Sequence, residues 1–202
     1  ALGILTKYFL NTRQWQKAAS VAQEVMDMDE YSLYPDYRDL FKVSTEPNRG
    51  EFIFAFSCSP IGQGNNYLAH SLPPKYPTSQ KNFGTQFRTT DFVVHLFASG
   101  DQRAELIITE YSPYDSEDTI QLVGECPELP EAEHARSFKY WPDPNVNGPS
   151  AGNDIPVIRY ADIILSRAEA LNEINGPTQE SVDLINEVRD RAKAPLLNLS
   201  DV

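Results

Sequence analysis

Two helical segments joined by a Gly-Pro break run from Pro156 to Pro195 and restrict the architectures open to this chain. Within PVIRYADIILSRAEALNEINGPTQESVDLINEVRDRAKAP, small and apolar residues recur every three or four positions, which is the spacing of a helix face. Gly176 suits a left-handed residue after the first helix, Pro177 prevents that helix from continuing, and Thr178 is a favoured capping residue for the second. The segment therefore predicts a helical hairpin.

Residues 1–30 repeat this arrangement, with a short helix, a turn at Asn11 and Thr12, and a second helix. The residues expected to face the core of the two hairpins are small or apolar and follow the helical period: Leu2, Leu5, Phe9, Trp15, Ala18, Ala19, Ala22, Val25, Met26, Ala161, Ile164, Leu165, Ala168, Leu171, Val182, Ile185, Val188 and Ala192. Alanine at such positions lets two helices approach closely. A helix-turn-helix unit of about 34 residues with small residues at its packing positions is typical of a tetratricopeptide-like repeat.

Residues 31–155 separate the two hairpins, although helical repeats normally follow one another directly because each needs a neighbour to bury its apolar face. The segment is rich in turn formers, and loops of this length are usually functional or disordered. Short strands are predicted at three runs of β-branched and aromatic residues, 51–56, 91–97 and 105–111. We expect a mostly α fold for residues 1–202, a single domain in which helical hairpins at 1–30 and 156–195 carry a loop-rich insertion.

The composition is that of a folded, acidic protein. At 41% hydrophobic and 23% charged residues, the chain differs from a disordered one. The net charge of −12 argues against nucleic acid as a partner, because binding to a phosphate backbone draws on a surface of Lys and Arg. No stretch approaches the roughly 20 apolar residues that span a bilayer, and the start has no basic leader, so any export signal is expected outside these residues.

The sequence has no motif for catalysis or metal binding. His70, His95 and His134 are isolated, and no HExxH, G-x-S-x-G or P-loop pattern occurs, so no metal or cofactor is predicted. A pair of carboxylates that cleaves a glycosidic bond is defined by its separation in space, which leaves an enzyme acting on polysaccharide as an alternative. Cys58 and Cys126 lie too far apart for a CxxC motif, and we interpret them as two unlinked, buried thiols, with a single disulfide as the alternative.

Several stretches, in order along the chain, resemble one protein family. IPVIRYADIILSRAEALNE followed by VDLINEVRDRA is similar to the signature of the SusD/RagB family of outer-membrane nutrient-binding lipoproteins. Upstream, YSLYPDYRDLF and NRGEFIFAF resemble the family's segment after a helix pair, and FVVHLFASGDQR resembles a later stretch. The family's lipid-bearing cysteine and its last helices have no counterpart here, so the resemblance implies an internal fragment of a protein more than twice as long.

The resemblance also implies a function. SusD-like proteins lie on the outer surface of Gram-negative bacteria as a lid over a SusC-like TonB-dependent transporter, and they bind oligosaccharide, or peptide in some members, without catalysis. For this chain the resemblance implies glycan binding for uptake through such a transporter, with the membrane reached only through a lipid anchor outside the chain. The alternative is a helical-repeat scaffold whose concave face binds a peptide or a partner protein.

Glycan binding without catalysis needs aromatic faces that stack on pyranose rings and polar groups that bond to sugar hydroxyls. The insertion offers both, in QGNNYLAHSLPPKYPTSQKNF and FKYWPDPNVNG. The predicted stacking residues are Tyr67, Tyr76, Phe83 and Trp141, and the predicted hydroxyl contacts are Asn65, Asn66 and Lys75. Each aromatic residue has packing as an alternative role, which for Trp141 means packing under the second hairpin. The charged residues of the signature helix are interpreted as structural ion pairs and caps: Arg159, Asp162, Arg167 and Glu169.

Overall fold

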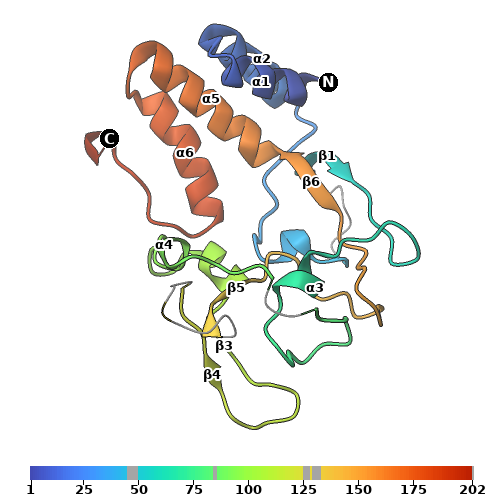
Figure 1. The fold of residues 1–202 in the computed structure, drawn as a ribbon. Coiled ribbons are helices and arrows are strands. Elements are labelled where there is room, and N and C mark those ends of the chain that lie inside the picture. Colours follow the sequence, from blue (N-terminus) through green and yellow to red (C-terminus); the bar gives the residue numbers. More distant parts are fainter. Residues whose placement is uncertain (45–49, 84–85, 125–127, 129–132, 202) are drawn as a thin grey trace. The chain divides into compact units, whose positions relative to one another are not determined.

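The computed structural model, drawn in Figure 1, describes residues 1–44, 50–83, 86–124, 128 and 133–201. The chain divides into two compact units. The first, here called the helical unit, comprises Ala1–Asp36, Pro47–Phe56 and Pro156–Val202, and the second, here called the loop unit, comprises Tyr37–Glu46 and Ser57–Ile155. The chain thus leaves the helical unit twice and returns to it twice. That residues 1–202 make a single domain stays a prediction.

Four helices frame the helical unit: α1 (Leu2–Asn11), α2 (Trp15–Asp27), α5 (Tyr160–Asn175) and α6 (Gln179–Arg191). α2 packs against both α1 and α5, and α5 packs in turn against α6. In Figure 1 the two blue helices therefore lie beside the two orange ones. The two hairpins are neighbours although residues 31–155 separate them in sequence, which confirms the predicted architecture of tetratricopeptide-like hairpins around an insertion.

Alanine lines the contact between the two hairpins, as the helical period predicts. Ala18 and Ala170 are fully buried in a cluster with Leu10, and Ala22 is fully buried in a second cluster with Ile163. Because a methyl group takes little room, α2 and α5 can approach closely along this face.

The predicted core face of α1 is correct in part: Leu2 and Phe9 are partly buried and pack against the core clusters, but Leu5 does not. The buried positions of this helix are Gly3, Thr6 and Leu10. Leu5, which the helical period assigned to the core, is 38% exposed. Gly3 instead faces two strand residues, since a Cβ atom placed on it would lie 3.1 Å from Cγ2 of Ile53 and 3.4 Å from Cγ2 of Ile158. The smallest residue of α1 thus lets the helix lie close to a strand pair.

Leu165 was also predicted to face the core, and it is 40% exposed. α5 buries two of its sides instead of one stripe. Ile163 packs with Ala22 of α2, and Ile164 packs with Leu184 of α6. Two consecutive residues are buried because the helix has a neighbour on each side.

The turn between α5 and α6 forms as its local signals predict. Gly176 follows α5 with a φ of +73°, a backbone conformation that residues with a side chain rarely adopt. The Thr178 hydroxyl accepts a hydrogen bond from the backbone N–H of Ser181 (3.2 Å), and the Ser181 hydroxyl accepts one from that of Thr178 (3.1 Å). This reciprocal pair marks the start of α6.

One predicted strand is confirmed. The run 51–56 forms β1 (Phe52–Phe56), which pairs with β6 (Ile155–Arg159) directly before α5. The backbone N–H of Tyr160 donates to the carbonyl of Glu51 (2.8 Å). The start of β1 therefore lies beside the end of β6, so that the two strands run antiparallel.

The other two predicted strands differ in the structure. Residues 91–97 contain a short helix, α4 (Asp91–Val94), instead of a strand. Thr90 adopts the extended conformation of a residue before a helix, and Asp91 places a carboxylate in the first turn, where the helix dipole favours it. These start signals outweigh the β-branched content that follows them.

The run 105–111 divides among several short elements. It covers the end of the 3₁₀ helix η2 (Gln102–Leu106), then β2 (Ile107–Ile108) and β3 (Glu110–Tyr111). β2 pairs antiparallel with β5 (Arg136–Ser137), and β3 pairs antiparallel with β4 (Ile120–Gln121). The loop unit also contains η1 (Asp39–Phe41) and α3 (Tyr67–Ser71), and the 3₁₀ helix η4 (Leu199–Asp201) follows in the helical unit.

Apolar side chains fill the loop unit despite its irregular backbone. Leu68 and Leu72 are almost fully buried, and the ring of Phe41 meets that of Tyr140 edge-on at 5.9 Å.

Cys58 is half-buried and not fully buried as predicted, and burial raises the pKa of its thiol. The prediction for Cys126 lies outside the described residues. None of the helices in the described ranges combines the length and the apolar character that crossing a bilayer requires.

A buried carboxylate joins the strand pair to α6. Glu51 is 0% exposed, and its Oε1 accepts a hydrogen bond from Nη1 of Arg159 (2.5 Å). Its Oε2 accepts from Nη1 of Arg191 (2.6 Å) and from the backbone N–H of Tyr34 (2.6 Å). The structural role predicted for Arg159 is therefore confirmed.

Two further charged residues of the signature helix pair across helices. Asp162 on α5 pairs with Lys7 on α1 at 2.9 Å, and Arg167 on α5 pairs with Glu180 on α6 at 2.7 Å. Both pairs confirm the interpretation of these residues as members of interhelical ion pairs.

Candidate ligand-binding site

Residues 73–83 form a loop that hydrogen bonds hold in place. The side-chain amide of Asn82 donates to the carbonyl of Pro73 (2.6 Å), so the loop closes on itself. The backbone N–H of Lys81 donates to the carbonyl of Gly148 (2.8 Å). The loop is thereby tied to a distant part of the same unit, which fixes the side chains that it carries.

This loop borders a pocket of about 400 Å³, here called the aromatic pocket. The residues that line it are Pro74, Lys75, Tyr76, Thr78, Gln80, Asn82, Phe83 and Tyr114. Three aromatic rings and several amide or hydroxyl groups converge on a volume typical of small-molecule sites. The structure thus brings together Lys75, Tyr76 and Phe83, three of the seven residues that the sequence singled out.

Two other rings support Tyr76 in the pocket. Its ring centroid lies 6.1 Å from that of Tyr111 and 5.6 Å from that of Phe138. Burial raises the pKa of Tyr76, so its hydroxyl stays protonated at neutral pH and can both donate and accept a hydrogen bond. A ring held in this way can stack on the apolar face of a sugar without first being ordered.

Phe83 begins a row of rings that continues away from the pocket. Its ring is 44% exposed, and the Lys81 ammonium lies 5.2 Å from the ring centroid. The His70 ring lies 5.2 Å from Phe83 and 5.7 Å from Phe87, which is itself 46% exposed. Tyr67 follows at 5.6 Å from Phe87. These four rings, here called the aromatic row, are joined by successive ring contacts that start with Phe83 of the pocket.

Lys75 and Tyr114 form the more open part of the pocket. The Lys75 ammonium lies 2.7 Å from a carboxylate oxygen of Asp115, and this hydrogen bond raises the pKa of Lys75. The backbone N–H of Tyr114 donates to the carbonyl of Lys75 (3.0 Å), and the Tyr114 side chain is 71% exposed. An ammonium group has three donors, so the pair with Asp115 leaves Lys75 able to bond to a ligand.

Asn65 and Asn66 do not line the aromatic pocket. Asn65 is 3% exposed, its Nδ2 donates to the carbonyl of Asn153 (3.2 Å), and its Oδ1 accepts from the backbone N–H of Tyr67 (2.9 Å). Asn66 is exposed, and its Oδ1 accepts from the Ser150 hydroxyl (2.9 Å). The buried amide of Asn65 therefore shapes the loop that precedes α3.

Tyr67 and Trp141 both pack inside the loop unit. The Tyr67 ring meets that of Tyr140 at 5.5 Å, and the Trp141 ring meets that of Phe138 edge-on at 4.9 Å. The indole N–H of Trp141 donates to the carbonyl of Arg38. These contacts favour a packing role for Trp141, with partners in the loop unit and not in the second hairpin that the sequence suggested.

Thr78, Gln80 and Tyr114 are among the pocket residues that sequence reasoning did not single out. Thr78 and Gln80 lie in the quoted loop, but a polar loop residue is expected to be exposed, and the 3% exposure of Gln80 has no local signal. Tyr114 reaches the pocket from another loop. Its position between Pro113 and Asp115, beside turn formers, marks an exposed ring but does not show which loop it meets.

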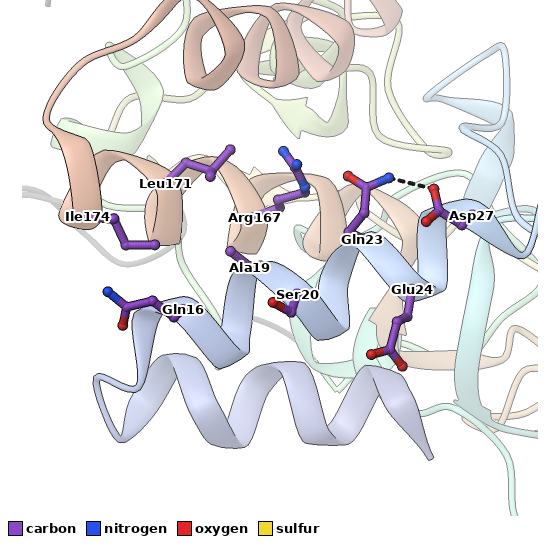
Figure 2. A pocket seen from close by; sticks show the side chains of 9 residues that line it. All are labelled: Gln16, Ala19, Ser20, Gln23, Glu24, Asp27, Arg167, Leu171 and Ile174. Carbon is purple, nitrogen blue, oxygen red and sulfur yellow. Dashed lines mark hydrogen bonds between the residues drawn. The ribbon is translucent and has the colours of Figure 1, made fainter.

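A second hollow, of about 550 Å³, lies along α2 and α5 of the helical unit and is here called the helix hollow (Figure 2). The residues that line it are Gln16, Ala19, Ser20, Gln23, Glu24, Asp27, Arg167, Leu171 and Ile174. Figure 2 shows Leu171 and Ile174 toward one end, and at the other end Gln23 donates to Asp27 (2.6 Å). None of these lining residues is aromatic. In the described ranges, no three His, Cys, Asp or Glu side chains lie close enough to hold a metal ion.

Comparisons with known proteins agree on one family. Residues 135–202 match the model of the SusD family. SusD-like protein P2 of Formosa agariphila is 26% identical over 212 residues, which covers 96% of this chain and 41% of that protein. A SusD superfamily protein from Parabacteroides distasonis has a TM-score of 0.76 at 24% identity, over 98% of this chain and 45% of its own. A structure solved with xylogluco-oligosaccharide has a TM-score of 0.76 at 20% identity, over 99% of this chain and 45% of its own.

The chain spans less than half the length of each of these proteins. The sequence match falls on β5, β6 and the helices α5 and α6, where the signature residues build the second hairpin. The fold match covers nearly the whole chain, including the loop unit. The chain thus matches the SusD family by sequence in its carboxyl-terminal third, and it shares the fold of SusD-like proteins over nearly its whole length.

Proposed function

We propose that the protein binds oligosaccharide without cleaving it and that the aromatic pocket is part of its binding site. The observation that carries this proposal is the convergence of three rings, Tyr76, Phe83 and Tyr114, with the amides of Gln80 and Asn82 on one pocket. Aromatic faces match the apolar faces of pyranose rings, and amides match their hydroxyls. The protein of similar fold that was solved with xylogluco-oligosaccharide supports a glycan as the class of ligand.

The aromatic row gives a longer glycan a second place to bind. Phe83 belongs to both the pocket and the row, and the exposed ring of Phe87 lies beyond His70. Successive rings at this spacing can stack on successive sugars of one chain. In this proposal, one sugar occupies the pocket and its neighbours lie along the row.

Surface location and delivery to a transporter are part of the same proposal. The match to the SusD family supports a place at the outer membrane of a bacterium, with a lipid anchor outside this chain and a SusC-like TonB-dependent transporter as partner. The net charge of −12 agrees with a neutral ligand and not with nucleic acid.

The second candidate function is binding of a peptide or protein by the helical repeats. The helix hollow favours it, because it lies on the helices and has Leu171 and Ile174 at one end. Its lining residues include no aromatic anchor of the kind that dominates protein interfaces. The loops, in contrast, carry an aromatic pocket, so glycan binding is the better-supported function.

Catalysis finds no support in the pocket itself. A glycosidase uses two carboxylic acids on either side of the scissile bond, and none of the residues that line the aromatic pocket is an Asp or a Glu. Prolonged incubation with a bound polysaccharide should therefore release no product. Release of reducing sugar by the purified protein would contradict this part of the proposal.

Affinity electrophoresis through gels that contain soluble polysaccharides tests the function. The wild type is compared with the double variant Tyr76→Ala/Phe83→Ala, and both proteins include any sequence that flanks this chain in its gene. We expect one class of polysaccharide to retard the wild type, and the double variant to lose about 1–3 kcal/mol of binding per ring, by analogy with base stacking on aromatic residues.

The matched control is Phe92→Ala. Phe92 is 73% exposed, lies in the loop unit and does not line the pocket, so its removal should leave the retardation unchanged. Equal retardation of the double variant and the wild type would reject the site. No retardation of the wild type by any polysaccharide would reject the function and favour peptide or protein recognition.

A further inference from the structure

Lys75 has an unusual backbone conformation in the loop that borders the aromatic pocket. It is the third residue of a turn, which the backbone N–H of Tyr76 closes by donating to the carbonyl of Pro73 (3.3 Å). Its φ is +58°, a left-handed conformation that Gly and Asn adopt far more readily than lysine does. Such strain persists only where surrounding contacts hold the residue in place. Lys75 must therefore be held by contacts from outside its own turn.

These contacts come from residues 112–119, here called the Tyr114 loop, which joins β3 to β4. The carbonyl of Lys75 accepts a hydrogen bond from the backbone N–H of Tyr114 (3.0 Å). The ammonium of Lys75 lies 2.7 Å from Oδ2 of Asp115. Both the backbone and the side chain of Lys75 thus fasten the Tyr114 loop to the loop that borders the pocket.

The Tyr114 ring depends on this attachment more than the other rings of the pocket do. The Tyr76 ring packs against those of Tyr111 and Phe138. The Tyr114 side chain, in contrast, is 71% exposed, and none of the described residues places a ring against it. Polar contacts of its own backbone and of the next residue, Asp115, are therefore what keeps this ring at the pocket.

We propose that Asp115 is a positioning residue, whose ion pair with Lys75 holds the Tyr114 ring at the aromatic pocket, where it stacks on a sugar. This inference rests on the proposed function. Asp115 does not line the pocket, so it acts on the ligand through Tyr114 and not by contact. The Lys75 and Asp115 side chains are 56% and 44% exposed, and an exposed ion pair changes an equilibrium by no more than about fivefold.

The test combines Asp115→Asn with Tyr114→Ala in affinity electrophoresis. The probes are xyloglucan, galactomannan, arabinoxylan, laminarin and polygalacturonate, and the dissociation constant is measured for each one that retards the wild type. Asp115→Asn alone should weaken binding about threefold, because the ring is then less often in place. In the Tyr114→Ala background the same change should have no effect, since the ring that Asp115 positions is gone. Equal losses in the two backgrounds, or no loss in either, overturn the inference.

Two controls separate positioning from a general effect of lost charge. Asp115→Glu keeps a carboxylate within reach of the flexible lysine side chain and should bind as tightly as the wild type. Glu105→Gln removes another exposed ion pair of the loop unit, in which Arg38 and Glu105 lie 2.9 Å apart with side chains 39% and 51% exposed. Neither of these two residues lines the pocket, so binding should stay unchanged. A loss in Glu105→Gln as large as that in Asp115→Asn overturns the inference.

The free protein gives a readout that needs no ligand. Exchange of the Tyr114 backbone amide with water, measured by NMR, reports how often its hydrogen bond to the Lys75 carbonyl opens. Each rate is divided by that of a peptide of residues 112–119 with the same substitution, which removes the direct effect of the changed charge on exchange. The corrected rate should rise about threefold in Asp115→Asn and stay unchanged in Glu105→Gln.

The failure of this inference can be told apart from the failure of the proposed function. An unchanged corrected rate at Tyr114 in Asp115→Asn overturns the inference. If Tyr76 and Phe83 still govern retardation in that case, the proposed function stands. No retardation of the wild type by any probe removes the proposed function and the inference together.

Discussion

Replacing Glu51 by glutamine tests whether a buried carboxylate holds the helical unit together. Glu51 is fully buried and accepts hydrogen bonds from Arg159, Arg191 and the backbone of Tyr34. Glutamine has nearly the same shape, but it carries no charge and turns an N–H donor toward an arginine. Neutralising one partner of a buried ion pair costs about 3–5 kcal/mol, because the remaining charge stays buried. We expect the lower end, about 3 kcal/mol, since the Arg159 side chain is 21% exposed and can regain water.

Urea and thermal unfolding, followed by far-ultraviolet circular dichroism, measure this loss. For a chain of this size, about 3 kcal/mol corresponds to a fall in Tm of about 6–12 °C. The control is Glu180→Gln, since the Glu180 side chain is 59% exposed and its pair with Arg167 lies at the surface. An exposed pair contributes less than about 1 kcal/mol. Equal losses in the two variants would refute the argument that burial makes Glu51 important.

A double-mutant cycle then separates the ion pair from the burial of a new amide. Arg191→Met removes the more buried of the two arginines, whose side chain is 5% exposed. If Glu51 and Arg191 stabilise each other, the double variant should lose less stability than the sum of the two single variants. Strict additivity would show that the carboxylate acts through its other partners.

Three further changes test other parts of the structure. Tyr114→Ala should weaken glycan binding by about 1–3 kcal/mol in isothermal titration calorimetry, yet leave the unfolding midpoint unchanged because the ring is 71% exposed. Gly176→Ala should lower stability by about 1 kcal/mol in a urea titration, because a φ of +73° strains any side chain, and an unchanged midpoint would contradict this. Glu187→Gln should raise stability at neutral pH, because burial raises the pKa of Glu187. Because the pKa of Glu187 is higher in the folded than in the unfolded state, the wild type is destabilised as the pH rises through the folded-state pKa and not below the unfolded-state pKa. The advantage of the variant should therefore vanish below a pH of about 4, which thermal unfolding at several pH values measures.

Local signals were enough to predict the parts of the fold that depend on neighbouring residues. Gly176 and Thr178 end one helix and begin the next through contacts within the same turn. The core face of α1 depends on Gly3 meeting Ile53 and Ile158, which come from distant parts of the chain. The helical period of α1 contains no information about those partners, so it assigned Leu5 to the core and did not assign Gly3.

The same distinction applies to the candidate site. Tyr76 and Phe83 could be singled out because they share one loop with turn formers and amides. The structural role of Asn65 could not be predicted, because it depends on the hydrogen bond from its side chain to the carbonyl of Asn153. The burial of Gln80 likewise depends on Pro149, which is remote in sequence. Composition identifies a loop that can bind sugar, but tertiary contacts decide which of its polar groups are free to do so.

The way the chain enters and leaves the long insertion explains how the repeats tolerate it. β1 ends at Phe56 and β6 begins at Ile155, and the antiparallel pairing of the two strands brings these ends together. Residues 57–154 thus form a very long hairpin loop. Each halving of a loop's length favours the closed state by about 0.6 kcal/mol, so a long loop costs little more than a short one.

It follows that the helical unit should not need residues 57–154 to fold. We predict that the chain still folds when an Asn-Gly turn replaces this segment. Leu40 and Phe41, which are buried in the loop unit and would become exposed, are changed to serine in this variant. Its helical circular dichroism should be lost in one cooperative transition on heating, and Glu51→Gln should lower the midpoint as it does in the whole chain. A non-cooperative transition would show instead that the loop unit stabilises the repeats, and the glycan site could then not be exchanged independently of its frame.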